Sequence, residues 1–171
     1  LMVVSCEQGG GEFYYVAHAG GGVNEEAYNN NMTALASSYL RGFDLVELDF
    51  LVTRDGYVTC GYTWEAEGWE GRVPLHNEFV LKVGRKRCTL SEVYSWLKVN
   101  GGVRIVIDAK ESPTFVWSYI AKNYPDVIDR FIPQAYDLSD IYLLQKLGYE
   151  DIYLTLYRYK SHKVWPAIES L

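Results

Sequence analysis

The stretch of sequence that decides the fold is FDLVELDFLVTRDG, residues 43–56. Its apolar and β-branched residues, followed by Arg-Asp-Gly at residues 54–56, predict a buried strand that runs into a turn. Successive side chains of a strand point to opposite faces, so Glu47 and Asp49 lie side by side on one face. The apolar residues before, between and after these two acids face the other way.

Two carboxylates in an otherwise apolar strand repel each other and lose hydration, so they favour a bound cation. Oxygen ligands suit a hard divalent ion such as Mg²⁺ or Ca²⁺. The alternative is a strand edge whose acids face solvent. The strand by itself favours the second interpretation, because most Glu-x-Asp pairs in strands face solvent.

Length and composition limit the classes of protein to consider. The chain has 171 residues, 49% of them hydrophobic, which is enough for one globular domain with a sizeable core. Its net charge is −6 without a long basic block, so nucleic acid is not an expected partner. No apolar run approaches the length of a membrane span. The cysteines, Cys6, Cys60 and Cys88, form neither a zinc pattern nor an evident disulfide framework.

The first residues allow two interpretations. Residues 2–6, Met-Val-Val-Ser-Cys, resemble the end of a bacterial lipoprotein signal in which Cys6 is lipidated. Such an anchor would place the chain at the cell envelope. The alternative is a short strand followed by a Gly-rich linker. In either case we expect residues 1–12 to form an N-terminal tail and residues 13–171 to form the domain.

From residue 13 onward, predicted strands and helices alternate. Strands are expected over residues 13–18, 43–52, 57–62, 103–110, 131–136 and 151–157, and helices over 29–41, 89–100, 113–124, 139–147 and the segment that ends at Leu171. Thr89 and Glu92 fit a capping box at one helix start. Residues 63–87 are predicted to be a long irregular excursion, a kind of loop that is usually functional.

Alternating units of this kind predict a parallel sheet covered by helices. A closed (β/α)₈ barrel needs roughly 250 residues, with about 200 as the lower limit. The chain therefore supplies about five β/α units with one extra hairpin strand after the second, which is an incomplete TIM-type barrel. An open doubly wound sheet is the alternative. Either sheet has open edges, which favour self-association.

Both architectures bind ligands at the carboxyl ends of their strands. The residues expected there are polar or ionisable: His18, Glu47, Asp49, Asp108, Lys110, Gln134 and Tyr157. Asp108, from a neighbouring strand, would complete an all-oxygen metal site, and Lys110 beside it would meet an anion. Two alternatives remain, since His18 could be a core histidine and Lys110 could simply neutralise Asp108.

Several motifs along the chain occur in the order in which one enzyme family carries them. They are VAHAGG at 16–21, ELD at 47–49 with TRDG at 53–56, IDAK at 107–110, FIPQAY at 131–136 and LTLYR at 154–158. In these motifs the chain resembles the glycerophosphodiester phosphodiesterase family, and the last two are similar to a bacterial branch of it. The resemblance runs from about residue 15 to residue 158.

The resemblance implies a TIM-type barrel that uses a divalent cation to hydrolyse glycerophosphodiesters or related small-molecule phosphodiesters. The family's general acid/base histidine matches His18, and its metal-binding acids match Glu47, Asp49 and Asp108. Lys110 would then face the phosphate. Asn31 falls where the family keeps an asparagine at the start of its first helix.

The sequence also departs from the family pattern. Tyr62 stands where the second catalytic histidine is expected, and tyrosine, with an ordinary pKa near 10, is a poor proton shuttle at neutral pH. Ala19 replaces the usual arginine, and the last three barrel units are absent. Trp64 is expected at the pocket mouth, against the substrate. His76 could fold over the site in place of the missing histidine, or it could be solvated.

Two functions from different classes follow. The first is a metal-dependent phosphodiesterase in which His18 and Tyr62 are catalytic and Lys110 and Trp64 bind the substrate. The second is a catalytically impaired homologue that keeps the metal and phosphate site, or a fragment of a longer active enzyme.

Overall fold

A computed structural model of the chain describes residues 2–5, 13–23 and 26–156. Its strands are β1 (Met2–Ser5), β2 (Phe13–Ala17), β3 (Leu45–Val52), β4 (Val58–Cys60), β5 (Arg104–Ala109), β6 (Phe131–Ala135) and β7 (Tyr153–Leu154). Its α-helices are α1 (Met32–Leu40), α2 (His76–Val83), α3 (Leu90–Leu97), α4 (Pro113–Asn123) and α5 (Leu138–Lys146). Three short 3₁₀ helices accompany them, η1 (His18–Gly20), η2 (Gly84–Lys86) and η3 (Pro125–Arg130).

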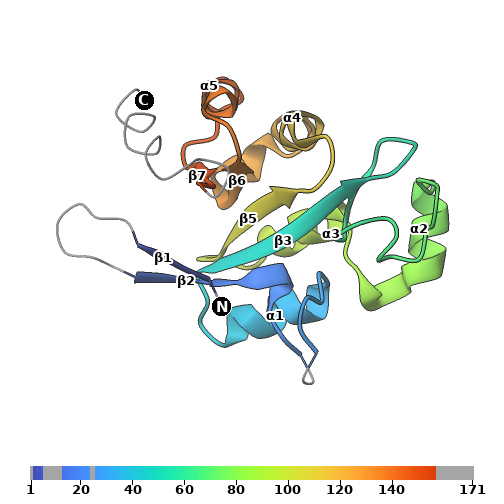
Figure 1. Cartoon of the computed structure of the whole chain (residues 1–171). Helices are drawn as coiled ribbons and strands as arrows, with labels where there is room; N and C mark the ends of the chain where they lie inside the picture. The colour runs from blue at the N-terminus through green and yellow to red at the C-terminus, as the bar shows by residue number, and fades with distance from the viewer. Residues whose placement is uncertain (1, 6–12, 24–25, 157–171) are drawn as a thin grey trace.

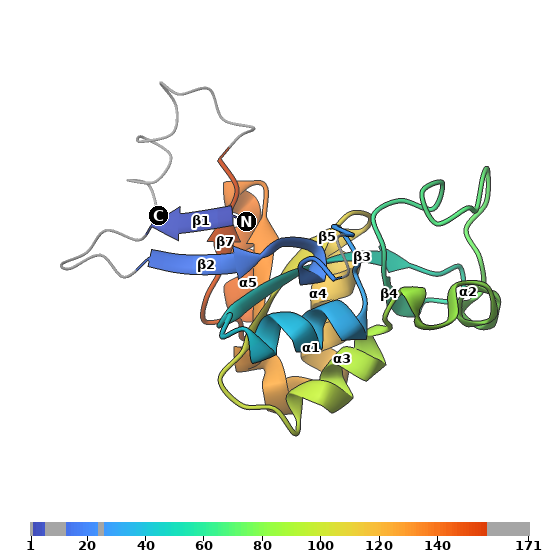
Figure 2. The ribbon, with the colours of Figure 1, turned by 90° about the horizontal axis from the view of Figure 1, so that it is seen from below.

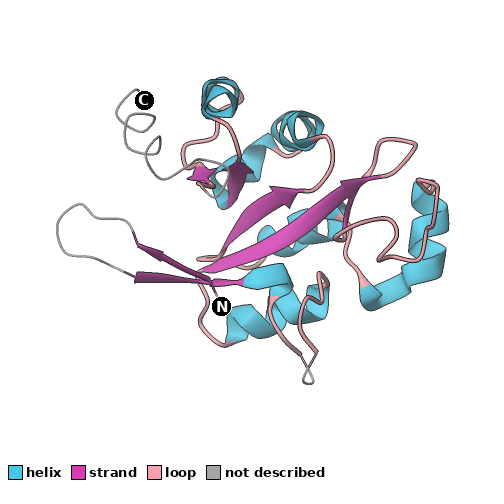
Figure 3. Cartoon of the chain, in the orientation of Figure 1, coloured by secondary structure: helices cyan, strands magenta, loops and turns pink. Residues whose placement is uncertain are grey.

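The strands form one sheet in the order β1-β2-β3-β5-β6-β7, with β4 beside β3 (Figure 1). Within the described residues, β2, β3, β5, β6 and β7 pair in parallel. Strands β1 and β4 pair antiparallel with β2 and β3. The sheet is curled and the helices flank it (Figure 3). This is an incomplete TIM-type α/β barrel with a hairpin strand after the second unit, which confirms the predicted fold class.

Strand β3 is buried on both of its faces, as its apolar sequence requires. Val46, Leu48 and Phe50 pack into the main core together with residues of the helices. The opposite face lines the inside of the curled sheet, where Val16 and Val106 contribute to a smaller apolar cluster. The acids Glu47 and Asp49 alternate along β3 with the apolar residues that pack into the main core, so these acids also lie on the inner face.

The excursion over residues 63–87 contains the helix α2 and the 3₁₀ turn η2, so the prediction of an irregular segment was wrong for these parts. The residue before α2 is Leu75, which has no side-chain oxygen to signal a helix start. Glu78 supplies the cap instead, because its Oε2 accepts a hydrogen bond of 2.8 Å from the Leu75 amide. By contrast, the predicted capping box of Thr89 and Glu92 is confirmed.

A disulfide joins Cys60 at the end of β4 to Cys88 at the end of the excursion, with their Cα atoms 5.0 Å apart. The expectation that the cysteines form no evident framework was therefore wrong for this pair. The two residues are 28 positions apart and meet only because the excursion returns to β4. The backbone continues this contact, since the Cys60 amide donates to the Cys88 carbonyl at 2.7 Å.

Residues 2–5 form a short strand that pairs with β2, as one of the two interpretations of the N-terminus predicts. Cys6 and the glycines after it lie outside the described residues, so a lipid anchor and the tail boundary at residue 12 stay predictions. The expected last helix, Tyr157 and Arg158 also lie outside them. None of the described helices, the longest of which has 11 residues, has the length and apolar character of a membrane span.

Candidate active site

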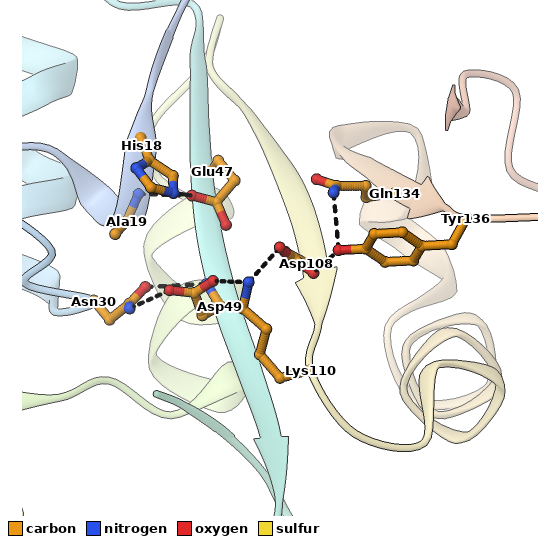
Figure 4. A network of polar contacts seen from close by, with 9 residues as sticks. All are labelled: His18, Ala19, Asn30, Glu47, Asp49, Asp108, Lys110, Gln134 and Tyr136. Atoms are coloured by element: carbon orange, nitrogen blue, oxygen red, sulfur yellow. Dashed lines mark hydrogen bonds and ion pairs between the residues drawn. The ribbon is translucent and has the colours of Figure 1, made fainter. Parts of the chain in front are cut away.

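The register between β3 and β5 brings three acids together. Asp49 pairs with Asp108 across the two strands, and Glu47 lies two residues before Asp49 on the same face. One carboxylate oxygen from each acid lies within 4.8 Å of those of the other two. All three residues are buried, with 3%, 3% and 7% of their surface exposed in sequence order. Figure 4 shows their side chains directed to one side of the sheet.

Glu47 has the properties of a ligand that needs a cation. Its Oε2 accepts a hydrogen bond of 2.6 Å from the Ala19 amide, whereas its Oε1 is buried without a hydrogen-bond partner among the described residues. Burial, followed by repulsion from Asp49, raises the pKa of Glu47 to about 8. A buried acidic oxygen without a donor, beside two further carboxylates, fits a hard divalent ion.

Asn30 fixes Asp49 from the other side. Its Nδ2 donates to Asp49 Oδ2 at 2.7 Å, and its Oδ1 accepts from the Asp49 amide at 3.0 Å. The φ angle of Asn30 is 44°, in the left-handed region that asparagine tolerates better than most residues. Asn31 instead caps α1, accepting from the Ala34 amide at 2.8 Å. Nothing in the sequence run of asparagines tells these two roles apart.

Lys110 neutralises the acids in this structure. Its Nζ lies 2.8 Å from Asp49 Oδ1 and 2.5 Å from Asp108 Oδ2. Burial by itself would lower the pKa of Lys110, but its hydrogen bonds to Asp108 and Asp49 outweigh burial and raise that pKa. The same ammonium lies 4.9 Å from the ring centre of Tyr62. This ion pair is the contact expected if Lys110 neutralises Asp108, and its predicted contact with a phosphate stays a prediction.

A relay of hydrogen bonds holds Asp108 from the side of β6. The Tyr136 hydroxyl donates to Asp108 Oδ1 at 2.6 Å, and Gln134 Nε2 donates to the Tyr136 hydroxyl at 2.9 Å (Figure 4). Gln134 was predicted at the carboxyl edge, whereas Tyr136 was missed. A signal for Tyr136 existed, because it follows Gln134 by two residues and so continues the same face.

His18 follows β2 and faces the acids. Its Nε2 lies 3.6 Å from Glu47 Oε2, and its side chain is 43% exposed, so it is not a core histidine. The ring of Tyr28 meets it edge-on, with 5.1 Å between ring centres. Ala19, directly after it, has a φ of 49°, a strained value of the kind that occurs at functional sites.

These side chains surround one cavity of about 620 Å³. Its lining consists of His18, Tyr28, Asn30, Asp49, Tyr62, Ala66, Glu67, Arg87, Asp108, Lys110, Gln134 and Tyr136. The predicted histidine, lysine and tyrosine and two of the three predicted acids therefore line this cavity, and the third acid, Glu47, lies behind His18 with 3.6 Å between Oε2 and Nε2. It also adds an ion pair that the sequence did not suggest, in which Arg87 Nε lies 2.8 Å from Glu67.

Trp64 and His76 lie elsewhere. Trp64 is a core residue of the excursion, 3% exposed, rather than a lining residue of this cavity. It packs edge-on against Phe79, and its Nε1 donates to Glu111 at 3.0 Å, which holds the indole away from the pocket mouth. His76 begins α2 and stacks on Tyr57, with 4.4 Å between ring centres, so it does not fold over the site and does not line the cavity.

No protein-family model matches this sequence, and no curated protein matches it. Solved structures do match. A putative glycerophosphodiester phosphodiesterase from Galdieria sulphuraria has a TM-score of 0.65 and 16% identity, over 90% of this chain and 70% of its own. A glycerophosphoryl diester phosphodiesterase from Parabacteroides distasonis has a TM-score of 0.58 and 15% identity, over 81% of this chain.

A third match is the putative glycerophosphoryl diester phosphodiesterase from Silicibacter pomeroyi, with a TM-score of 0.55 and 13% identity over 87% of this chain and 67% of its own. The chain spans only 53% of the Parabacteroides distasonis protein. Identities this low bear on the fold alone. The part of the chain that the structure describes therefore has, in incomplete form, the barrel fold of the glycerophosphodiester phosphodiesterases.

Proposed function

We propose that this chain is a member of the glycerophosphodiester phosphodiesterase family and acts on small-molecule phosphodiesters with a divalent cation, Mg²⁺ or Ca²⁺. The observation that carries the proposal is the convergence of Glu47, Asp49 and Asp108, with ligand atoms within 4.8 Å of one another and His18 beside them. This cluster lies at the carboxyl edge of a barrel whose fold matches such enzymes.

The three acids would hold the cation. When bound there, a divalent ion would neutralise the phosphate charge and stabilise negative charge on the phosphate oxygens. With a cation held by the acids, the Lys110 ammonium would be able to turn from Asp49 and Asp108 to the phosphate. Asn30 and Tyr136 then keep the two aspartates in place through the hydrogen bonds they already make.

The chain's own groups supply the proton transfers. A hydroxyl of the substrate's glycerol attacks phosphorus, and the His18 imidazole accepts the proton of that hydroxyl. Glu47, 3.6 Å away, stabilises the imidazolium that results. As the bond from phosphorus to the leaving alcohol breaks, the Tyr62 hydroxyl, which lines the same cavity, gives that alcohol its proton and a cyclic glycerol phosphate remains. Water then opens this ring: the Tyr62 phenolate takes a proton from the water that attacks phosphorus, and the His18 imidazolium returns its proton to the glycerol oxygen that leaves. Because a tyrosine stands here in place of a second histidine, proton donation to the leaving alcohol is the slow step.

The second candidate is a homologue that binds the cation and phosphate without efficient turnover. It is favoured by Tyr62, which stands where the resemblance places a second catalytic histidine. The experiment that separates the two measures hydrolysis of a glycerophosphodiester, with Mg²⁺ or Ca²⁺, by the wild type and by Tyr62→His and His18→Ala. Turnover that rises in Tyr62→His and disappears in His18→Ala supports the enzyme.

No turnover in the wild type or in Tyr62→His, together with saturable cation binding, supports the binding function. Turnover that His18→Ala leaves unchanged would overturn the catalytic assignment.

A further inference from the structure

Helix α2 buries some of its apolar side chains and exposes others. Phe79 and Val83 are buried against the rest of the excursion. Leu81 lies on the opposite side of the helix and is 85% exposed, and Val80, at the side of the helix next to it, is 42% exposed. A helix on a protein surface normally has a polar outer face, and exposed apolar side chains that lie together indicate a surface that is covered by a partner.

The end of the excursion is basic although the chain is acidic. Residues 82–87 contain four Lys or Arg residues and no acid, whereas residues 63–81 contain four Glu and one Arg, and the whole chain has a net charge of −6. Arg85 and Lys86 follow α2 directly in η2 and are exposed. A short segment of opposite charge to the rest of the protein favours an anionic partner.

The segment that follows α2 reaches the candidate active site. In Figures 1 and 2, α2 stands apart from the helices that flank the sheet, beyond the end of β3 and next to β4. Arg87, directly after η2, lines the cavity. At its other end, α2 begins at His76, which stacks on Tyr57 of the turn between β3 and β4.

Other loops at this edge of the sheet also expose aromatic rings. Tyr28 and Tyr62 line the cavity and are 65% and 57% exposed. Tyr57 and Phe115 are exposed as well, and the Phe115 ring lies next to Gly56, beside Tyr57 in the same turn. Exposed tyrosines and phenylalanines beside basic and aliphatic residues are typical of surfaces that meet the boundary between lipid head groups and acyl chains.

We propose that α2 and η2, together with Tyr57, dock on an anionic lipid surface and bring the cavity to the head groups. Val80 and Leu81 enter the acyl boundary, and Arg85 and Lys86 meet anionic head groups. It follows that the substrate is a phosphodiester carried by a membrane lipid, and this part rests on the proposed function. The docking on a lipid surface is independent of the proposed function.

The test is co-sedimentation of the full chain with vesicles of phosphatidylcholine plus phosphatidylglycerol and with vesicles of phosphatidylcholine alone. We expect binding to the first, weaker binding to the second, and loss of binding as salt rises from about 0.1 M to about 1 M. Leu81→Ser should lower the partition coefficient about 10-fold. Leu40→Ser is the matched control, because Leu40 on α1 is 82% exposed, close to the 85% of Leu81.

Charge is tested in the same assay. Arg85→Glu with Lys86→Glu should abolish the preference for the anionic vesicles, whereas Lys122→Glu with Lys146→Glu, on α4 and α5, should keep it. Wild-type chain that binds neither kind of vesicle, or equal effects of Leu81→Ser and Leu40→Ser, would overturn the proposal. So would a dimer that Leu81→Ser dissociates without any vesicle binding, since a second copy would then cover α2.

Vesicle binding is measured without turnover, so the two proposals fail separately. If His18→Ala binds the vesicles as well as the wild type does, this result supports docking even where no hydrolysis occurs. Hydrolysis of a soluble glycerophosphodiester without vesicle binding would support the enzyme and contradict the docking.

Discussion

The Cα atoms of Asp49 and Asp108 are direct partners in the parallel register of β3 and β5. This pairing places both carboxylates on the inner face of the sheet, on the side that Glu47 also occupies. A shift of one residue would move Asp108 to the face that the helices cover, because strand side chains alternate. The candidate metal site therefore depends on one strand register, which the buried apolar residues of β3 and β5 determine.

Tyr136→Phe tests the relay that holds Asp108. Without the hydroxyl, Asp108 Oδ1 loses its donor, and removal of such an outer partner weakens metal binding by roughly 10–100-fold. Calorimetric titration with Mg²⁺ or Ca²⁺ measures the change. Tyr149→Phe is the control, since its hydroxyl donates to the Trp117 carbonyl in the core. It should lower stability by about 1 kcal/mol and leave cation affinity unchanged. Equal affinities in the wild type and in Tyr136→Phe would remove this role.

Lys110→Met tests whether the ammonium competes with the cation. Lys110 Nζ lies 2.8 Å from Asp49 and 2.5 Å from Asp108, where it neutralises charge that a cation would otherwise meet. Its removal should tighten cation binding in the absence of substrate and lower turnover on the phosphodiester. The measurement combines calorimetry with an activity assay. Weaker cation binding in Lys110→Met would contradict the competition.

The pKa of Glu47, raised to about 8 in the folded chain, predicts a dependence of stability on pH. Between its ordinary pKa of 4.5 and about 8, the folded state keeps a proton that the unfolded state has released. The stability that this proton contributes is fully present below about pH 4.5 and is lost as the pH rises through about 8. Urea denaturation of metal-free protein at several pH values should show this fall in the wild type. The stability of Glu47→Gln should not show this fall. If the stabilities of the wild type and of Glu47→Gln change with pH in parallel, the proton on Glu47 does not cause the fall.

The disulfide predicts a further loss of stability. Cys60 and Cys88 are 28 residues apart, and closing a loop of that size stabilises a folded chain by about 3.5 kcal/mol in the chain-entropy model. Cys60→Ala with Cys88→Ala should lower the free energy of unfolding by about that amount. A reductant should destabilise the wild type similarly and leave the double variant unaffected. An unchanged denaturation midpoint in the double variant would show that the bond contributes nothing.

The double variant Cys60→Ala with Cys88→Ala should also weaken cation binding at the candidate active site. The Cys88 amide donates to the Asn30 carbonyl at 3.1 Å, and the Asn30 side chain holds Asp49. Cation affinity should therefore fall in the cysteine variant and not in Cys6→Ala. Equal cation affinities in the double variant and in Cys6→Ala would show that the disulfide does not support the metal site.

Local patterns explain how much of this molecule could be predicted from its sequence. The alternation in β3 predicts both the buried strand and the shared face of Glu47 and Asp49, because a strand has a fixed period. The capping box predicts the start of α3, because Thr89 and Glu92 satisfy the first amides of the helix themselves.

The remaining features depend on contacts between distant residues. Helix α2 was missed because Leu75 carries no capping oxygen, and the disulfide because its partners meet only after the excursion returns to β4. Trp64 was expected at the pocket mouth, but its packing against Phe79 turns it into the core. No local pattern reports such packing.

Titration of the metal-free chain with Mg²⁺ and Ca²⁺ tests the central claim most directly. It compares the wild type with Glu47→Gln, Asp49→Asn and Asp108→Asn, and with Asp44→Asn, which changes an exposed acid before β3. We expect one cation per chain in the wild type and in Asp44→Asn. Each of the other three variants should lose more affinity than the roughly 10–100-fold caused by removing an outer partner. Wild-type affinity in Asp108→Asn would contradict the account, because the site would then not join β3 to β5.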